Sequence, residues 1–78
     1  MPQFFFHLYD DTVALDGEGK ELPSTDEARE EAIKQAREMA CAEVLEGHLG
    51  LSHRIEVTDA YDGPVATVRF KDAVKLHP

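Results

Sequence analysis

The sequence predicts an α+β domain in which one helix lies across one face of a four-stranded antiparallel sheet, in the element order β-β-α-β-β. Three observations support this fold. A capped and strongly charged helix is expected from Ser24 to Gly47, a hairpin of short strands precedes it in residues 3–15, and a second hairpin follows it in residues 53–70. We expect the whole chain, 1–78, to be one domain, because 78 residues leave room for a single apolar core.

The first hairpin begins with residues 3–9, which are rich in aromatic side chains, lack glycine and follow Pro2. A turn at Asp10 and Asp11 leads to a shorter strand in residues 12–15. Residues 16–20 are expected to form a loop, because two glycines and three charged residues do not continue a strand. The alternation of the first strand separates one face (Phe4, Phe6 and Leu8) from the other (Phe5, His7 and Tyr9).

The start of the helix carries the clearest local signal. Ser24 and Glu27 match the capping box, in which the Ser24 side chain accepts a hydrogen bond from the Glu27 N–H and the Glu27 side chain reaches back. Gly47 suits the left-handed position that follows the last residue of many helices. These two signals predict both ends of the helix.

The face of the helix that is expected to be buried consists mainly of small residues, which let a backbone approach a sheet rich in phenylalanine. Its members are Ala32, Ile33, Ala36, Ala40 and Val44, with Met39 or Cys41 at the flanks. We expect Cys41 to be a core residue and not a reactive thiol. As the single cysteine, it cannot form a disulfide within the chain, which fits a reducing cytosol.

In the second hairpin, residues 53–58 alternate between polar and apolar side chains and point Ile55 and Val57 inward. A turn over residues 59–63 follows, in which the pair Asp62-Gly63 is expected to supply a positive-φ position. The returning strand, residues 65–70, places Ala66, Val68 and Phe70 on one face. Residues 71–78 are expected to form a short helical turn and then a frayed tail.

The predicted strand order is 2-1-3-4, numbered along the chain. It places the two most apolar strands in the centre, where they do not expose unpaired backbone at a sheet edge. The predicted core residues are Phe4, Phe6, Leu8, Val13, Ile33, Ala36, Ala40, Val44, Ile55, Val57, Val68 and Phe70.

The chain is acidic, with a formal net charge of −8 that is concentrated in residues 1–50. General affinity for nucleic acid is not expected, because phosphate binding depends on clustered lysine and arginine. A basic protein partner is an open alternative to a helix that is acidic only for solubility. No apolar run approaches the roughly 20 residues of a membrane span, so we expect no contact with a membrane.

No residue pattern indicates catalysis or a cofactor. The chain has neither a nucleotide-binding glycine loop nor the G-x-S-x-G context of a hydrolase serine. The four histidines (His7, His48, His53 and His77) lack the close ligand spacing of a structural zinc site. We therefore predict a protein that is not an enzyme and has no cofactor and no dedicated metal ion.

The sheet face opposite the helix is the predicted interface. One helix covers only one side of the sheet, and an exposed apolar patch usually marks an interface. The residues assigned to this interface are Phe5, His7, Tyr9, Arg54, Val65 and Arg69. A homodimer through this face is the simplest interpretation. Single-stranded nucleic acid is the alternative, since aromatic rings stack on bases and arginines neutralise phosphates.

Four segments carry a resemblance to a known family: residues 1–8 (MPQFFFHL), 19–23 (GKELP), 27–32 (EAREEA) and 55–59 (IEVTD). The chain resembles a family of short uncharacterised proteins, a domain of unknown function, that is abundant in alphaproteobacteria and especially in rhizobial relatives. The resemblance covers nearly the whole chain and implies no particular activity, cofactor or catalytic residue.

A looser similarity of architecture links the chain to HicB-type antitoxins. It is carried by Leu22, Pro23, Thr25 and Ala28, and it implies no function, because one fold serves many functions. Together these observations predict a small acidic cytosolic domain that binds another protein or regulates it.

Overall fold

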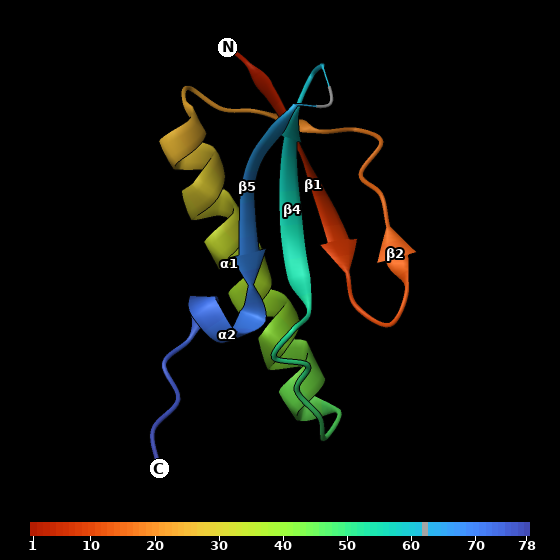
Figure 1. The fold of residues 1–78 in the computed structure, drawn as a ribbon, viewed down its shortest axis with the longest axis vertical. Helices are drawn as coiled ribbons and strands as arrows, with labels where there is room; N and C mark the ends of the chain where they lie inside the picture. Colours follow the sequence, from red (N-terminus) through yellow and green to blue (C-terminus); the bar gives the residue numbers. More distant parts are fainter. Residues whose placement is uncertain (62) are drawn as a thin grey trace.

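One long helix, α1 (Thr25–Leu45), lies across a single face of an antiparallel sheet (Figure 1). The structure is a computed structural model that describes residues 1–61 and 63–78. The strands are β1 (Gln3–Tyr9), β2 (Val13–Ala14), β3 (Lys20–Glu21), β4 (Arg54–Asp59) and β5 (Pro64–Arg69), and a short helix, α2 (Phe70–Ala73), follows β5. The predicted α+β class, with an antiparallel sheet and one main helix, is confirmed.

The sheet has the order β2-β1-β4-β5, so the two apolar strands β1 and β4 are central, as predicted. It differs in detail from the prediction because a fifth strand, β3, also pairs with β1. The pairs Gln3–Glu21 and Phe4–Lys20 place β3 beside the start of β1, on the edge that β2 occupies at its end. Lys20 was expected in a loop. Lys20 forms part of a strand because its backbone pairs with Phe4, which lies far away along the chain, and no local sequence pattern predicts such a pairing.

The predicted N-cap at Ser24 and the predicted left-handed glycine at Gly47 are confirmed, whereas the hydrogen bonds of the described residues do not include the return contact of the Glu27 side chain. The Ser24 side chain accepts a hydrogen bond from the Glu27 N–H at 3.4 Å. At the other end, Gly47 has a φ of 93°, and the N–H groups of Gly47 and His48 donate to the carbonyls of Val44 and Glu43. This pattern is the Schellman motif, which turns the chain sharply away from the helix. Among the described residues, no helix is long and apolar enough to cross a membrane.

Four alanines spaced four residues apart (Ala28, Ala32, Ala36 and Ala40) form the face of α1 that the sheet buries. Each step of four residues advances about 40° around a helix of 3.6 residues per turn, so the stripe drifts slowly. Val44 follows Ala40 by four residues, near the end of α1, and it is 58% exposed. The prediction that Val44 lies in the core is therefore wrong.

Cys41 is exposed, which contradicts the expectation of a core residue. It follows Ala40 by one residue and so lies about 100° around the helix from the buried stripe.

Most of the other predicted core residues are buried or partly buried. Those that are buried are Phe4, Phe6, Ala36, Ala40, Ile55, Val57, Val68 and Phe70, while Leu8 and Ile33 are partly buried against them.

Val13 is also wrongly predicted as a core residue, since it is 58% exposed. It pairs with Tyr9 across β1 and β2, and residues paired in this way point to the same side of a sheet. Since Phe4 and Phe6 point toward α1, Tyr9 and Val13 point away from it. The register of a two-residue strand thus decided which face Val13 occupies.

The chain beyond β5 is packed for one helical turn. Phe70 and Ala73 of α2 are buried, and the Ala73 carbonyl accepts a hydrogen bond from Arg37 Nε at 2.7 Å. Residues 71–73 are therefore not frayed. The positive-φ position predicted for Asp62-Gly63 lies outside the described residues, because Asp62 is not described. In the same turn, Asp59 Oδ1 accepts hydrogen bonds from the N–H groups of Tyr61 and Gly63.

Candidate functional site

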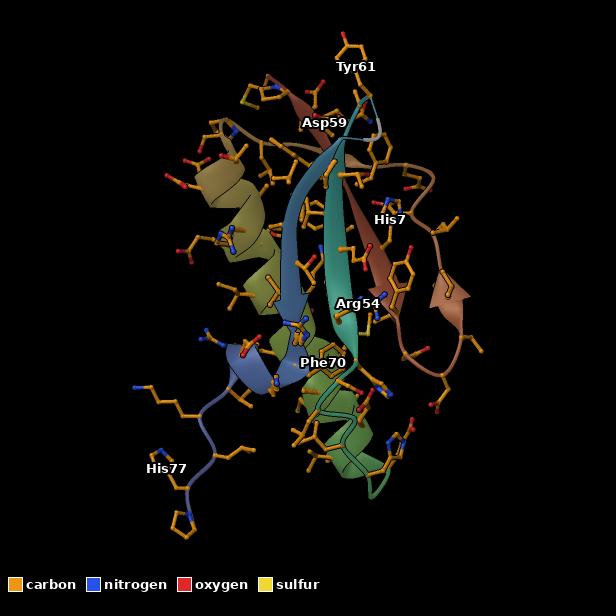
Figure 2. All side chains as sticks on the ribbon, in the orientation of Figure 1. His7, Arg54, Asp59, Tyr61, Phe70 and His77 are labelled. Carbon is orange, nitrogen blue, oxygen red and sulfur yellow. The ribbon has the colours of Figure 1, made fainter. Side chains whose placement is uncertain are left out.

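The open sheet face, opposite α1, brings together five of the six residues predicted as an interface. Phe5, His7 and Tyr9 follow one another on this side of β1, Tyr9 pairs with Arg54 of β4, and Arg54 pairs with Arg69 of β5. Figure 2 shows the positions of His7 and Arg54 on the sheet, with Phe70 below them at the start of α2. These five residues therefore form a continuous row on one face of β1, β4 and β5.

Val65 does not belong to this face. Val57 pairs with Ala66 and the next residue, Thr58, pairs with Pro64, so Val65 has no partner in β4. Such an extra residue is a β-bulge, which re-aims a side chain. Val65 packs against the core cluster on the α1 side, and its assignment to the open face is wrong.

The aromatic ring of Tyr9 is covered by the side chain of Arg54 from the neighbouring strand β4. The guanidinium of Arg54 lies 4.4 Å from the centre of the ring, in a cation–π contact. The same Arg54 donates from Nε to Glu56 Oε2 at 2.6 Å. A base that stacked on Tyr9 would displace Arg54, and a phosphate would compete with Glu56 for it.

His7 and Phe5 are held by the loop that connects β2 and β3. The Asp16 N–H donates to His7 Nδ1, so Nδ1 is the acceptor nitrogen and Nε2 can donate to Thr58 Oγ1 at 3.0 Å. Gly19 has a φ of 74°, and a Cβ built there would lie 2.9 Å from Phe5 Cε1. The loop therefore lies directly against Phe5 and reduces the apolar surface of the open face.

The Asp16 carboxylate anchors this loop to β1. It accepts hydrogen bonds from the backbone N–H groups of Phe6, Glu18 and Gly19, at 3.0–3.1 Å. Phe6 lies between the residues of β1 that pair with β3 and those that pair with β2, so the carboxylate bridges the gap between the two short strands. Partial burial raises the pKa of Asp16, but the three N–H donors outweigh it and the net pKa is lowered.

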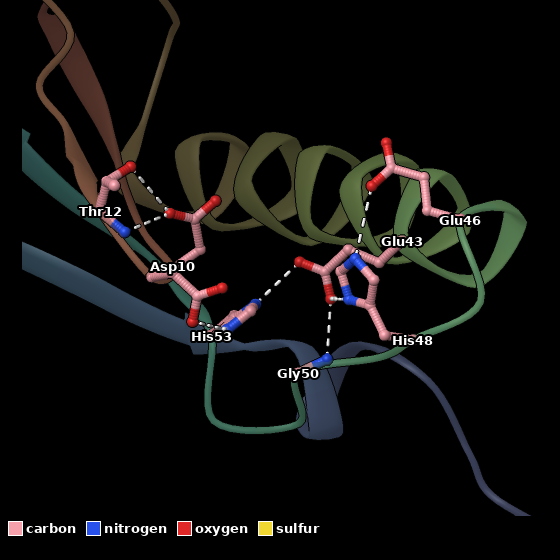
Figure 3. Close-up of polar contacts among 8 residues, drawn as sticks. Asp10, Thr12, Glu43, Glu46, His48, Gly50 and His53 are labelled. Carbon is pink, nitrogen blue, oxygen red and sulfur yellow. Dashed lines mark hydrogen bonds and ion pairs between the residues drawn. The ribbon is translucent and has the colours of Figure 1, made fainter.

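A second site, the acidic cavity, lies between the C-terminal half of α1 and the β1–β2 turn. Its volume is about 300 Å³, and its lining residues are Leu8, Asp10, Asp11, Met39, Ala42, Glu43, Glu46, His48 and His53. Figure 3 shows its polar residues, with Asp10 on one side and Glu43, Glu46 and His48 on the other. Four carboxylates thus surround an opening whose apolar wall is formed by Leu8, Met39 and Ala42.

The innermost polar contact of the acidic cavity joins Glu43 to His53. Glu43 Oε2 lies 2.7 Å from His53 Nδ1, and Glu43 Oε1 accepts a hydrogen bond from the Gly50 N–H at 2.7 Å (Figure 3). Both side chains are largely buried, at 13% and 15% exposure. The Schellman motif explains the geometry, because the reversal at Gly47 returns residues 48–53 to the helix end.

The pair shifts both pKa values away from their ordinary range. The hydrogen bond to Glu43 raises the pKa of His53, partial burial opposes this effect, and the negative charges of Glu43, Asp11 and Asp10 add to it. Partial burial raises the pKa of Glu43, but the Gly50 N–H and His53 outweigh it and the net pKa is lowered. Both shifts favour the charged pair.

Two more ionisable groups approach the pair from either side. Asp11 Oδ1 lies 3.7 Å from His53 Nε2, and His48 lies 3.9 Å from Glu43 and 3.4 Å from Glu46. His48 and His53, which are far from zinc-ligand spacing in the sequence, thus both contact one carboxylate. Within residues 1–61 and 63–78, however, no group of three or more histidine, cysteine or acidic residues could hold a metal ion.

Sequence reasoning missed the acidic cavity. Asp10 and Asp11 were assigned to a turn, and no role was predicted for Glu43. One local signal was available: Glu43 follows Ala40 by three residues and so lies on the buried side of α1. An acidic side chain on that side predicts a buried partner, although the spacing does not identify His53.

The fold and the cavity together define a small α+β domain with one helix-covered sheet face and an acidic cavity at one end of the helix. The chain belongs to the family described as a domain of unknown function (DUF6894), whose match covers residues 3–71. This match confirms the resemblance to an uncharacterised domain. No curated protein and no solved structure matches the chain.

Proposed function

We propose that the chain is a protein-binding domain, not an enzyme, and that it recognises a basic segment of a partner protein at the acidic cavity. The observation that carries this proposal is the composition of the cavity wall, where carboxylates of the β1–β2 turn face carboxylates of α1 across an apolar surface. Complementary charge steers association and selects partners. The net charge of −8 adds a long-range attraction for such a segment.

Two carboxylates of the acidic cavity, Asp10 and Glu43, have lowered pKa values, which favours their charged forms. The pKa of Asp10 is lowered by the hydrogen bond from the Thr12 N–H, against a smaller opposing effect of burial, and the Thr12 hydroxyl also contributes. The pKa of Glu43 is lowered as described above.

Since Cys41 is the single cysteine, a reducing cytosol is the compartment we propose for this interaction.

Selection of random peptides against the immobilised protein, followed by titration of the selected peptides, tests the proposal. We expect enrichment of lysine and arginine and an affinity that falls with salt. The variant Asp10→Asn/Asp11→Asn/Glu46→Gln should weaken binding. The matched control Glu18→Gln/Glu30→Gln/Glu38→Gln removes the same charge from exposed positions outside the cavity. An equal loss in both variants, or no enrichment of basic residues, would contradict the proposal.

Self-association through the open sheet face is a second proposed interaction. One observation favours it: Tyr9 and Val13 are adjacent across β1 and β2, and Val13 is largely exposed. Two copies of the protein that meet at this surface would bury the Tyr9 and Val13 side chains, and no additional segment would be needed to cover them. Sedimentation of the native protein and of Val13→Glu tests it, with Leu76→Glu, in the exposed tail, as the control. A native protein that stays monomeric at every concentration would contradict it.

The nucleic-acid alternative has less support. Tyr9 is covered by Arg54, and Arg54 is neutralised by Glu56, so the groups that would bind a base and a phosphate already bind each other. Titration with short DNA and RNA oligonucleotides separates the two classes of partner. Micromolar binding that weakens steeply with salt would favour nucleic acid.

A further inference from the structure

We infer that the acidic cavity is a receptor for a single lysine side chain of the partner protein. This inference rests on the proposed protein-binding function and names the chemical group that the cavity takes. It is argued from the size of the cavity, the balance of charge in its lining and the distribution of its apolar residues.

The acidic cavity is small and has room for a side chain. Pockets for drug-sized ligands span roughly 300–1,000 Å³, and this cavity, at about 300 Å³, is at the lower limit. It lies between two elements, with α1 on one side and the β1–β2 turn on the other (Figure 3).

The charge of the lining calls for a cation. Asp10, Asp11, Glu43 and Glu46 are four carboxylates, and the two imidazoles of His48 and His53 can neutralise at most two of them. The cavity therefore keeps a negative charge even when both histidines are protonated. The Glu43–His53 pair occupies the interior, whereas the Asp11 side chain is 95% exposed and Glu46 is 72% exposed. The carboxylates that remain for a ligand thus lie toward the opening.

The apolar wall calls for an aliphatic stem on that cation. Leu8 is partly buried, and Met39 and Ala42 line the cavity beside it. Lysine combines a four-carbon stem with a compact ammonium group that offers three donors, and it buries the stem while the charge stays near water. Arginine fits less well, because its planar fork favours one carboxylate in a two-point contact, whereas these carboxylates surround the opening.

The probe is a pentapeptide with one central lysine between glycines, capped at both ends, titrated into isotopically labelled protein and followed by NMR. We expect millimolar binding, with the largest shifts at Leu8, Met39 and the Gly50 amide. The same peptide with acetyllysine, which keeps the stem and loses the charge, should bind at least about tenfold more weakly, which corresponds to about 1.4 kcal/mol. The arginine peptide should bind more weakly than the lysine peptide.

Two variants on α1 distinguish the cavity from the surrounding surface. Ala42→Phe fills the cavity without changing charge and should abolish the shifts. Cys41→Phe adds the same ring at the neighbouring exposed position, which does not line the cavity, and should leave them unchanged. Thermal unfolding of both variants shows that they fold.

The outcomes separate this inference from the proposed function. If selected basic peptides lose affinity on Asp10→Asn/Asp11→Asn/Glu46→Gln but not on Ala42→Phe, the acidic surface binds the partner and the lysine cavity is wrong. Equal binding of the lysine and acetyllysine peptides, or equal binding to Ala42→Phe and Cys41→Phe, would also overturn it. Failure of every basic peptide would overturn both.

Discussion

Glu43 Oε2 lies 2.7 Å from His53 Nδ1, and this contact connects the last turns of α1 to the residue that precedes β4. The His53 ring also packs against the Phe70 ring in a T-shaped arrangement, with ring centres 5.7 Å apart, and Asp11 approaches from the β1–β2 turn. This one imidazole thus contacts the helix, the start of α2 and the turn beside β1. Its protonation therefore affects the stability of the fold as well as the charge of the cavity.

The first prediction concerns the pH dependence of stability. The pKa of His53 is raised above 6.5, so its stabilisation is complete below pH 6.5 and is lost as pH rises through the folded-state pKa. The pKa of Glu43 is lowered below 4.5, so its stabilisation is complete above pH 4.5 and is lost as pH falls through the folded-state pKa. The pair therefore stabilises most between pH 4.5 and pH 6.5.

Urea denaturation of the native protein and of His53→Gln across this range measures the effect. The difference in free energy of unfolding should be largest between those two pH values and should shrink on both sides. His77→Gln, in the exposed tail, is the control and should show no such maximum. A difference that does not vary with pH would contradict the prediction.

Gly50→Ala should destabilise the protein by about 1–3 kcal/mol, as overpacking does at well-packed positions. A Cβ at Gly50 would overlap the His53 ring, so the ring must move away from Glu43. The control is Gly17→Ala, where the added methyl meets no atom within 4 Å. Denaturation midpoints compare the two variants, and equal midpoints would show that the His53 ring is not held against Gly50.

Asp16→Ala should free the loop between β2 and β3 and cost about 1–3 kcal/mol, because it removes the acceptor of three backbone N–H groups. Hydrogen exchange at the Phe6 amide is the direct measurement, and it should become faster. Glu18→Ala changes an exposed carboxylate in the same loop and should leave that amide protected. Unchanged protection in Asp16→Ala would contradict the proposed anchor.

Phe6→Ala should cost about 3–5 kcal/mol, the usual loss for a buried phenylalanine. Val44→Ala should change stability by no more than about 0.5 kcal/mol, because Val44 is largely exposed. The sequence pattern places both residues in the core, whereas the structure buries only Phe6. Chemical denaturation of the two variants therefore shows which of these two assignments is correct. A large loss for Val44→Ala would mean that its surface is covered in solution.

Local signals predicted much of the fold and none of the acidic cavity. Ser24 and Gly47 act on the backbone a few residues away, so the ends of α1 can be read along the chain. The pairing of Glu43 with His53 depends instead on how sharply the chain turns at Gly47, and the approach of Asp11 depends on the register of β1 with β4. Sequence spacing does not report such distances.

By itself, the sequence determined the helix, the alternation of β1 and β4 and the central place of these two strands, because each follows from side-chain periodicity and burial of apolar surface. Only the tertiary structure decided the bulge that turns Val65 toward the core, the third short strand β3, the exposure of Val13 and Val44, and the meeting of Asp10, Glu43 and His53 around one cavity. The physical reason is that these features depend on contacts between residues far apart along the chain, and the whole packed fold sets their geometry.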